Sequence, residues 1–123
     1  ILDSIGKEIA RSRRSMNHII KRTVQYIDNH LAEDLSLEAI SEVVNTNPSY
    51  LSRIFKKECG ETLTEYTTKR RIERAKELLL QPDQLIYQVS KQVGFNDPAY
   101  FSTIFKKHTG VSPKEYKIRA RKY

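Results

Sequence analysis

The chain has 123 residues, of which 38% are hydrophobic, so it suffices for one small domain or two very small ones, with little apolar material for a deep pocket. No apolar stretch approaches the roughly 20 residues that a membrane-spanning helix requires, and the single cysteine, Cys59, excludes a disulfide framework and fits a reducing cytosol. We therefore expect a cytoplasmic protein; because no secretory signal opens the chain and Ile1 is not Met, we expect a fragment of a longer one.

The net charge of +7 is unevenly distributed along the chain. Residues 1–23 carry a net charge of +4, residues 24–46 carry −5, and residues 111–123 carry +4. A basic chain with a local acidic block indicates that one side faces a polyanion while another is turned away from it. The same charge would also serve solubility alone.

The first residues predict a connector and then a helix. Residues 1–16 hold a basic cluster and little that would pack, so we interpret them as a connector from a missing upstream domain. Residues 17–31 carry apolar residues at helical spacing, which predicts a first helix. These apolar residues are Ile19, Ile20, Val24, Ile27 and Leu31.

A short second helix and a turn follow. Ser36 is a suitable N-cap for a helix whose apolar residues recur at helical spacing. Asn45-Thr46-Asn47-Pro48 then predicts a turn, and Asn45 is a residue that accepts a positive φ. Helix, tight turn and helix together predict a helix-turn-helix unit. The apolar residues of the second helix are Leu37, Ile40, Val43 and Val44.

Residues 47–60 predict a third helix with two unlike faces. Asn47 is a good N-cap, proline follows at the first helical position, and Gly60 suits a left-handed C-terminal residue. At about 100° per residue, the apolar side chains gather on one side and short polar and cationic side chains on the other. Leu51, Ile54, Phe55 and Glu58 fall on the apolar side, and Ser49, Ser52, Arg53 and Lys56 fall on the other. Such a polar, cationic face suits a DNA major groove, although in a single copy a solvated face of a core helix would be the better interpretation.

Residues 62–80 predict a long helix between two such units. Thr62 and Glu65 form a capping-box pattern, and Gln81-Pro82-Asp83 ends the helix. Nineteen helical residues span about 28 Å, and recognition helices on one face of B-DNA lie about 34 Å apart. We therefore interpret this helix as a rigid spacer. Its expected buried stripe is Tyr66, Ile72, Ala75, Leu78 and Leu79.

The rest of the chain repeats the first unit. Residues 97–110 match residues 47–60 at eight of fourteen positions, and Gly94 stands where Asn45 stands in the first copy, so one supersecondary unit is used twice. The repetition of the same polar face favours DNA reading over a merely solvated face. The second copy places Phe101, Ile104 and Phe105 on the apolar side, and Ala99, Ser102, Thr103 and Lys106 on the other.

These elements predict an all-α fold of about seven helices, with two helix-turn-helix subdomains joined by a long linker helix. No hairpin signal or alternating run supports β structure. The predicted segments are the connector at 1–16, the first subdomain at 17–61, the linker helix at 62–81 and the second subdomain at 82–123. The basic residues of the chain's end either grip phosphates or keep that end solvated.

Three motifs in order resemble the DNA-binding region of AraC/XylS-type bacterial transcription regulators. They are Pro48-Ser49-Tyr50-Leu51-Ser52-Arg53-Ile54-Phe55-Lys56-Lys57, then Arg71-Ile72-Glu73-Arg74-Ala75-Lys76-Glu77-Leu78-Leu79, and then Val93-Gly94-Phe95-Asn96-Asp97-Pro98-Ala99-Tyr100-Phe101-Ser102, running on to Phe105-Lys106-Lys107 and Gly110-Val111-Ser112-Pro113. The resemblance covers about residues 17 to 121. In one departure, Asn45 replaces the glycine usual in the first turn.

The resemblance implies two helices, about 48–59 and 98–109, binding successive major grooves of double-stranded DNA. It also implies an upstream sensing or receiver domain, through which any dimerisation would run, and RNA polymerase as a partner. An alternative is the DNA-targeting module of an Ada-type repair regulator, and a weaker one is a helical module that binds only protein. The expected DNA-binding residues are Asn47, Ser49, Tyr50, Ser52, Arg53, Lys56, Lys57, Asn96, Pro98, Ala99, Ser102, Thr103, Lys106 and Lys107.

Other chemistry has little support in the residues. The three histidines share no ligand spacing, no glycine-rich loop cradles phosphate, and no serine pairs with a base, so we expect no enzyme, metal or cofactor. Cys59 is expected to be a small buried core residue rather than a reactive thiol. Tyr50 and Tyr100 contact phosphate or only pack. Arg53 reads guanine, contacts phosphate or pairs with Glu58.

Overall fold

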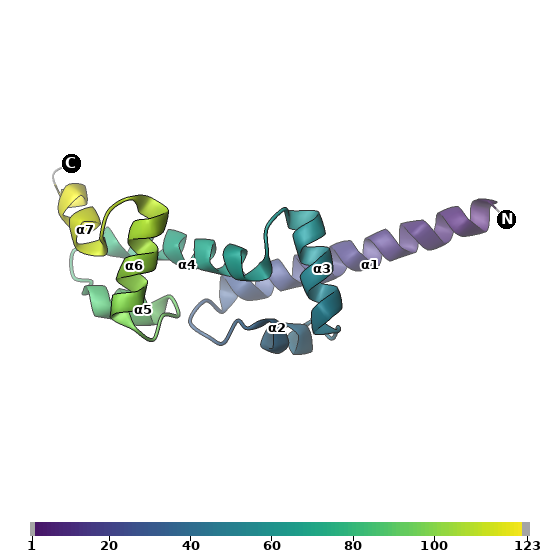
Figure 1. Ribbon diagram of the computed structural model, residues 1–123, viewed down its shortest axis with the longest axis horizontal. Helices are drawn as coiled ribbons and strands as arrows, with labels where there is room; N and C mark the ends of the chain where they lie inside the picture. The colour runs from purple at the N-terminus through teal and green to yellow at the C-terminus, as the bar shows by residue number, and fades with distance from the viewer. Residues whose placement is uncertain (1, 122–123) are drawn as a thin grey trace. The chain divides into compact units, whose positions relative to one another are not determined.

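The computed structural model describes residues 2–121, and every regular element in that range is a helix (Figure 1). This confirms the predicted all-α class and the seven helices. The helices are α1 (Leu2–Asn29), α2 (Leu37–Val43), α3 (Pro48–Cys59), α4 (Leu63–Leu79), α5 (Ile86–Gln92), α6 (Pro98–Thr109) and α7 (Pro113–Arg121).

The chain forms two compact units. The N-terminal unit comprises the residues up to Asn29 together with Leu35–Glu65. The C-terminal unit comprises His30–Asp34 together with the chain from Tyr66 onward. The short segment His30–Asp34 thus packs with residues that are distant in sequence. The four segments predicted from the sequence are a connector, two subdomains and a linker helix, whereas the two units are defined by their internal contacts. The boundaries of the four segments stay a prediction.

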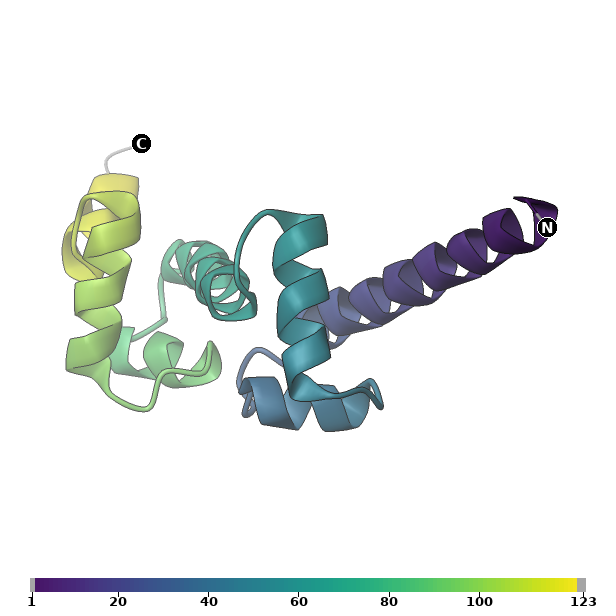
Figure 2. The same ribbon diagram turned by 45° about the vertical axis from the view of Figure 1, so that its right-hand side comes forward.

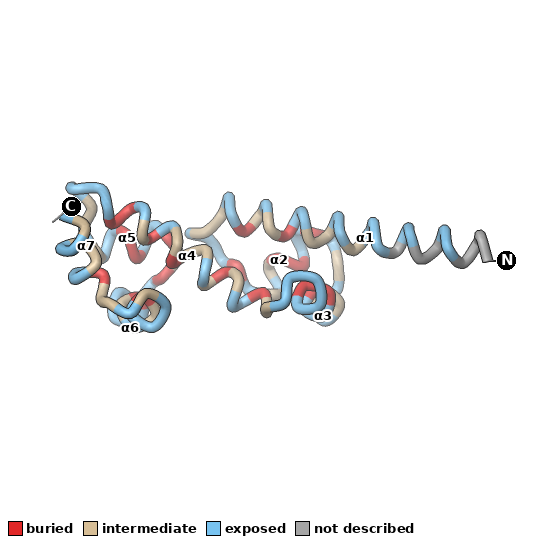
Figure 3. Tube along the Cα trace, turned by 90° about the horizontal axis from the view of Figure 1, so that it is seen from above, coloured by how far each residue is buried: buried red, intermediate tan, exposed pale blue. Residues whose placement is uncertain are grey.

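The first helix begins at Leu2 and runs without a break to Asn29, whereas its predicted start was residue 17. Nothing in residues 2–16 interrupts a helix, since the stretch has no proline and its Lys, Arg, Glu, Ala and Ile residues are compatible with one. A shortage of apolar residues in the sequence therefore did not mean the absence of a helix. Ala10, Arg11, Arg13 and Arg14 are exposed. Figure 3 shows exposed stretches along the N-terminal part of α1.

In the N-terminal unit, α3 packs against both α1 and α2 (Figures 1 and 2). Its buried hydrophobic side chains come from all three helices, from the segments that join them and from the first residue of α4. They are Ile27, Leu35, Ile40, Val44, Leu51, Ile54, Phe55 and Leu63. Burying these side chains together is what holds α3 with its polar face outward.

The ends of α2 are closed by hydrogen bonds. At the start, the Ser36 hydroxyl accepts from the Ala39 amide at 3.2 Å, as predicted. At the end, the Arg22 guanidinium on α1 donates to the carbonyls of Val43 at 3.0 Å and Val44 at 3.5 Å. A cation at these free carbonyls suits the negative end of a helix. Arg22 therefore ties the first helix of the helix-turn-helix to α1.

In the C-terminal unit, α6 packs against α5 and α7. Aromatic rings run through its core, with centroid separations of 5.3 Å from Phe95 to Phe101, 5.7 Å from Phe101 to Phe105 and 5.5 Å from Phe105 to Tyr116. Tilted and edge-on pairs at these separations are favourable aromatic geometries. The buried members of this core are Ile72, Ala75, Leu78, Leu79, Val89, Val93, Phe95, Phe101 and Phe105.

Arg71 on α4 connects the segment His30–Asp34 to the rest of the C-terminal unit. Its Nε donates to the Leu31 carbonyl at 3.0 Å, and Nη2 donates to the Glu33 carbonyl at 2.9 Å. Its guanidinium also lies 5.8 Å from the centre of the Phe95 ring. Burial lowers the pKa of Arg71, and the nearby Asp34 carboxylate raises it. One side chain thus holds backbone and ring together.

Candidate nucleic-acid interface

The two candidate recognition helices begin with the same cap. In α3, the Asn47 side chain accepts hydrogen bonds from the amides of Ser49 at 2.8 Å and Tyr50 at 3.2 Å. In α6, the Asp97 side chain accepts from the Ala99 amide at 2.9 Å. Both helices have proline in the first turn and end at a left-handed glycine, Gly60 with φ 77° and Gly110 with φ 87°. The predicted starts and stops are confirmed.

Burial divides α3 into the two predicted faces. Leu51, Ile54 and Phe55 are buried, with at most 2% of each side chain exposed. The opposite side, which we name the reading face of α3, consists of exposed residues: Ser49, Ser52, Arg53 and Lys56. Lys57 is exposed beside it. The helix therefore presents short polar and cationic groups that no core contact consumes.

The second helix follows the same division with different chemistry. Phe101 and Phe105 are fully buried, while Ile104 is half-buried. The reading face of α6 consists of Ala99, Ser102, Thr103 and Lys106, of which Ser102 is half-buried and the others are exposed. The remaining residues expected at this site are also exposed: Asn96, Pro98 and Lys107.

The hydroxyl of Thr103 is committed to its own helix. Its Oγ1 donates to the Ala99 carbonyl at 3.1 Å, so the oxygen lone pairs and the methyl group remain for a ligand. Arg53, at the matching position of α3, carries five N–H donors in a planar fork. The two reading faces therefore differ in what they can donate to a base edge.

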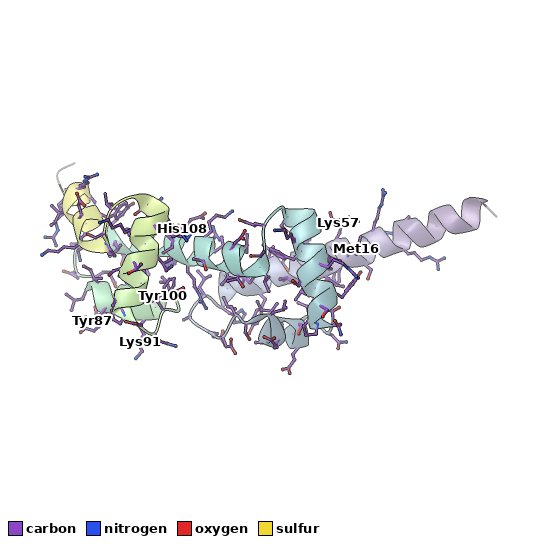
Figure 4. All side chains as sticks on the ribbon, in the orientation of Figure 1. Met16, Lys57, Tyr87, Lys91, Tyr100 and His108 are labelled. Atoms are coloured by element: carbon purple, nitrogen blue, oxygen red, sulfur yellow. The ribbon has the colours of Figure 1, made fainter. Side chains whose placement is uncertain are left out.

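The two matched tyrosines lie in different environments. Tyr50 is half-buried and lies beneath the guanidinium of Arg53, 5.4 Å from the ring centre. Stacking on an aromatic ring restricts the orientation of a guanidinium without using its donors. Tyr100 is 56% exposed, and its ring lies 6.1 Å from that of Phe95. Figure 4 labels Tyr100, on α6.

The turns before the two helices share a backbone conformation but not a packing environment. Asn45 has φ 54° and Gly94 has φ 99°, as predicted for matched positions. A β-carbon on Gly94, however, would lie 2.2 Å from the Leu31 carbonyl oxygen and 2.7 Å from Arg71 Nε. Gly94 is therefore required by close approach as well as by φ. The sequence carried no signal for this contact.

The expectation that Cys59 is buried is wrong. The residue is exposed, because it ends α3 beyond the last residues that the core covers. Partial desolvation raises the pKa of its thiol, and the neighbouring carboxylates of Glu61 and Glu58 raise the pKa further. A raised pKa lowers the thiolate fraction at neutral pH and with it the nucleophilicity.

Among the side chains that the structure describes, no group of three or more His, Cys, Asp or Glu lies close enough to hold a metal ion. No helix within residues 2–121 combines the length and the apolar composition that crossing a membrane requires.

Residues 40–119 match a family model described as a helix-turn-helix domain. The chain is similar to the C-terminal domain of AraT, a response regulator from Geobacillus stearothermophilus, with 43% identity, a TM-score of 0.79 and coverage of 82% of this chain and 84% of that one. It shares its fold with the DNA-binding domain of AdpA, solved with a target DNA, at 22% identity, a TM-score of 0.78 and coverage of 83% and 92%.

A longer relative matches through this region alone. The regulatory protein PocR of Salmonella typhimurium is 35% identical over 77 residues, which are 63% of this chain and 25% of that protein. The chain spans about a third or less of the length of the curated relatives that it matches first. The family model matches most of the chain, and the solved neighbours have the same fold. The two capped helices in their helix-turn-helix units fit that fold. The chain belongs to the helix-turn-helix family of AraC-type transcription regulators.

Proposed function

We propose that this chain is the sequence-specific, double-stranded DNA-binding domain of a bacterial transcription regulator. Residues 48–59 and 98–109 would enter successive major grooves. The observation that carries the proposal is the pair of helices, α3 and α6, each buried along one face and each presenting a polar, cationic face outward. The major groove admits a helix and displays acceptors that such side chains recognise.

The exposed residues divide into two kinds of contact. Lys56, Lys57, Lys106 and Lys107 are exposed point charges that suit phosphate oxygens. Arg53 suits the O6 and N7 atoms of guanine, which accept its two parallel donors. The caps Asn47 and Asp97 hold the first turn of each helix in place.

The wider context is part of the same proposal. The domain would work in the cytoplasm, downstream of a sensing or receiver domain that also supplies any dimerisation, and it would bring RNA polymerase to a promoter. AraT, a response regulator by its description, supports a receiver rather than a repair domain upstream. The Ada-type alternative gains no specific support from the residues described above.

Binding at increasing salt, followed by selection from a random duplex pool, tests the proposal. Four lysine–phosphate contacts predict that log K falls with log salt at a slope of about −3.6, since each contact contributes about −0.9. A selected sequence with two separate blocks of preferred base pairs would support two reading helices. Salt-independent binding, or a pool that yields no preferred sequence, would refute the proposal.

A further inference from the structure

A hollow of about 290 Å³ lies beside the reading face of α3, within the N-terminal unit. Arg13, Met16 and Asn17 line it from α1, and Lys57 and Glu58 line it from α3. Figure 4 labels two of these lining residues, Met16 on α1 and Lys57 on α3. The predicted DNA-binding residues include Lys57 but no residue of α1. The wall that α1 contributes to the hollow is therefore not part of the interface described above.

The hollow has the donors that a phosphate needs. Arg13 and Lys57 are exposed cations, and the Asn17 amide adds neutral donors. Glu58 is the one carboxylate among the described residues of its wall, and it works against an anion. Residues 9–27 of α1 contain five Lys/Arg and no Asp or Glu, so this part of α1 adds no carboxylate that would repel an anion. The described lining of the hollow thus carries two cations against one carboxylate, which favours an anion.

The position of Lys57 indicates which anion the hollow would bind. Lys57 follows Lys56, a member of the reading face, so a ligand of the hollow lies next to whatever α3 reads. A DNA backbone continues past the groove that a helix enters, and it carries a phosphate at every nucleotide. The hollow is thus open to the phosphates just outside the base pairs that α3 contacts.

We infer that α1 takes part in DNA binding: Arg13, with Asn17 and Lys57, holds a backbone phosphate of the duplex flanking the site read by α3. This inference rests on the proposed function and extends the interface to α1. It makes affinity depend on the length of DNA beyond the recognised bases. It adds no sequence preference, because a phosphate contact is the same at every base pair.

The test compares Arg13→Ala with Arg11→Ala on three duplexes. Arg11 is an exposed cation two residues away, about 200° around the same helix, so it controls for loss of charge alone. One duplex ends at the base pairs whose preference depends on Arg53, one extends about five base pairs beyond them, and one carries the same extra pairs at the opposite end.

On the first extended duplex, Arg13→Ala should weaken binding about eightfold at 0.1 M salt and reduce the salt slope by about 0.9, the value for one lost phosphate contact. Arg11→Ala should have a smaller effect that is equal on all three duplexes. Arg13→Lys should retain most of the affinity. Glu58→Gln should strengthen binding, and only on the first extended duplex.

If Arg13→Ala behaves as Arg11→Ala does on every duplex, the inference is wrong, while tight, salt-dependent binding by the parent leaves the proposed function intact. That outcome would favour an acidic protein segment as the ligand of the hollow. If the parent itself shows no sequence-preferring binding, the proposed function fails and the inference fails with it. Equal melting temperatures of all variants would exclude unfolding as the cause.

Discussion

Gly94 offers a sharp test of the packing in the C-terminal unit. Three glycines have positive φ: Gly60, Gly94 and Gly110. A β-carbon at Gly60 or Gly110 would have no heavy atom within 4 Å, apart from its chain neighbours, whereas at Gly94 it would lie 2.2 Å from the Leu31 carbonyl oxygen. Alanine at Gly110 therefore measures the backbone strain alone, and alanine at Gly94 measures strain together with the lost close approach.

The magnitudes follow from these two contributions. A left-handed conformation costs alanine about 1–2 kcal/mol, and the lower entropy of its unfolded chain offsets about 0.4–1 kcal/mol of that cost. Gly110→Ala should therefore lose about 1 kcal/mol of stability. At Gly94 the Leu31 carbonyl must also move away, which breaks its hydrogen bond from Arg71, and a charged hydrogen bond contributes about 1.5–3 kcal/mol. Gly94→Ala should lose about 2.5–4 kcal/mol in total.

Chemical denaturation of both variants beside the parent measures the difference. A third variant, Gly94→Asn, separates the two causes, because Asn45 occupies the matched position in the first unit at φ 54°. If φ alone mattered, asparagine would restore stability; we expect it to be as damaging as alanine. Equal losses for Gly94→Ala and Gly110→Ala, or full rescue by asparagine, would refute the close approach between Gly94 and Leu31.

Four further predictions concern the helices. Phe55→Ala should cost about 3–5 kcal/mol in urea unfolding because the ring is fully buried; unchanged stability would mean that the face of α3 is misassigned. Arg53→Ala should relax the preference at one or two base pairs in a selection from random duplexes, by about 1–3 kcal/mol, whereas Thr103→Ala should change it little; the opposite result would reverse the two roles. Lys106→Ala should weaken binding to all sequences alike and reduce the salt slope by about one in a titration, so a sequence-dependent loss would contradict a phosphate contact. Alkylation of Cys59 should be slower near pH 8 than that of a free thiol and should catch up only at higher pH, because its raised pKa delays formation of the thiolate; a rate that is already maximal at pH 8 would contradict that shift.

The sequence by itself determined the helical class, the caps and the two faces of each recognition helix. Asn47, Asp97, Gly60 and Gly110 act within one turn of their own helix, and the apolar periodicity of α3 is a property of adjacent turns. Such signals depend on residues within one or two turns of a helix, so they can be recognised without knowing which other helices pack against it. The repeat of the whole unit then identified the polar faces as a shared feature rather than an accident of one helix.

Two predictions from the sequence were wrong. One used the expected lack of packing to place the start of a helix, and the other used the residue type to predict burial. The start of α1 at Leu2 needed only the helix-forming residues of the stretch, and the prediction of a later start gave too much weight to the lack of apolar partners. Cys59 was expected in the core because cysteine is commonly buried. Its exposure follows from how far the core extends along α3, which residue type does not specify.

Only the tertiary structure decided the environment of Gly94, the role of Arg71 and the hollow beside Arg13. Leu31 meets Gly94 and Arg71 although it lies far from both in sequence, and Arg13 shares a hollow with Lys57 on another helix. These contacts depend on how whole helices pack, which is set by the sum of many weak, non-directional apolar contacts. A pattern of residues shows which face of a helix is buried, but the particular atom that meets it follows only from the packed chain.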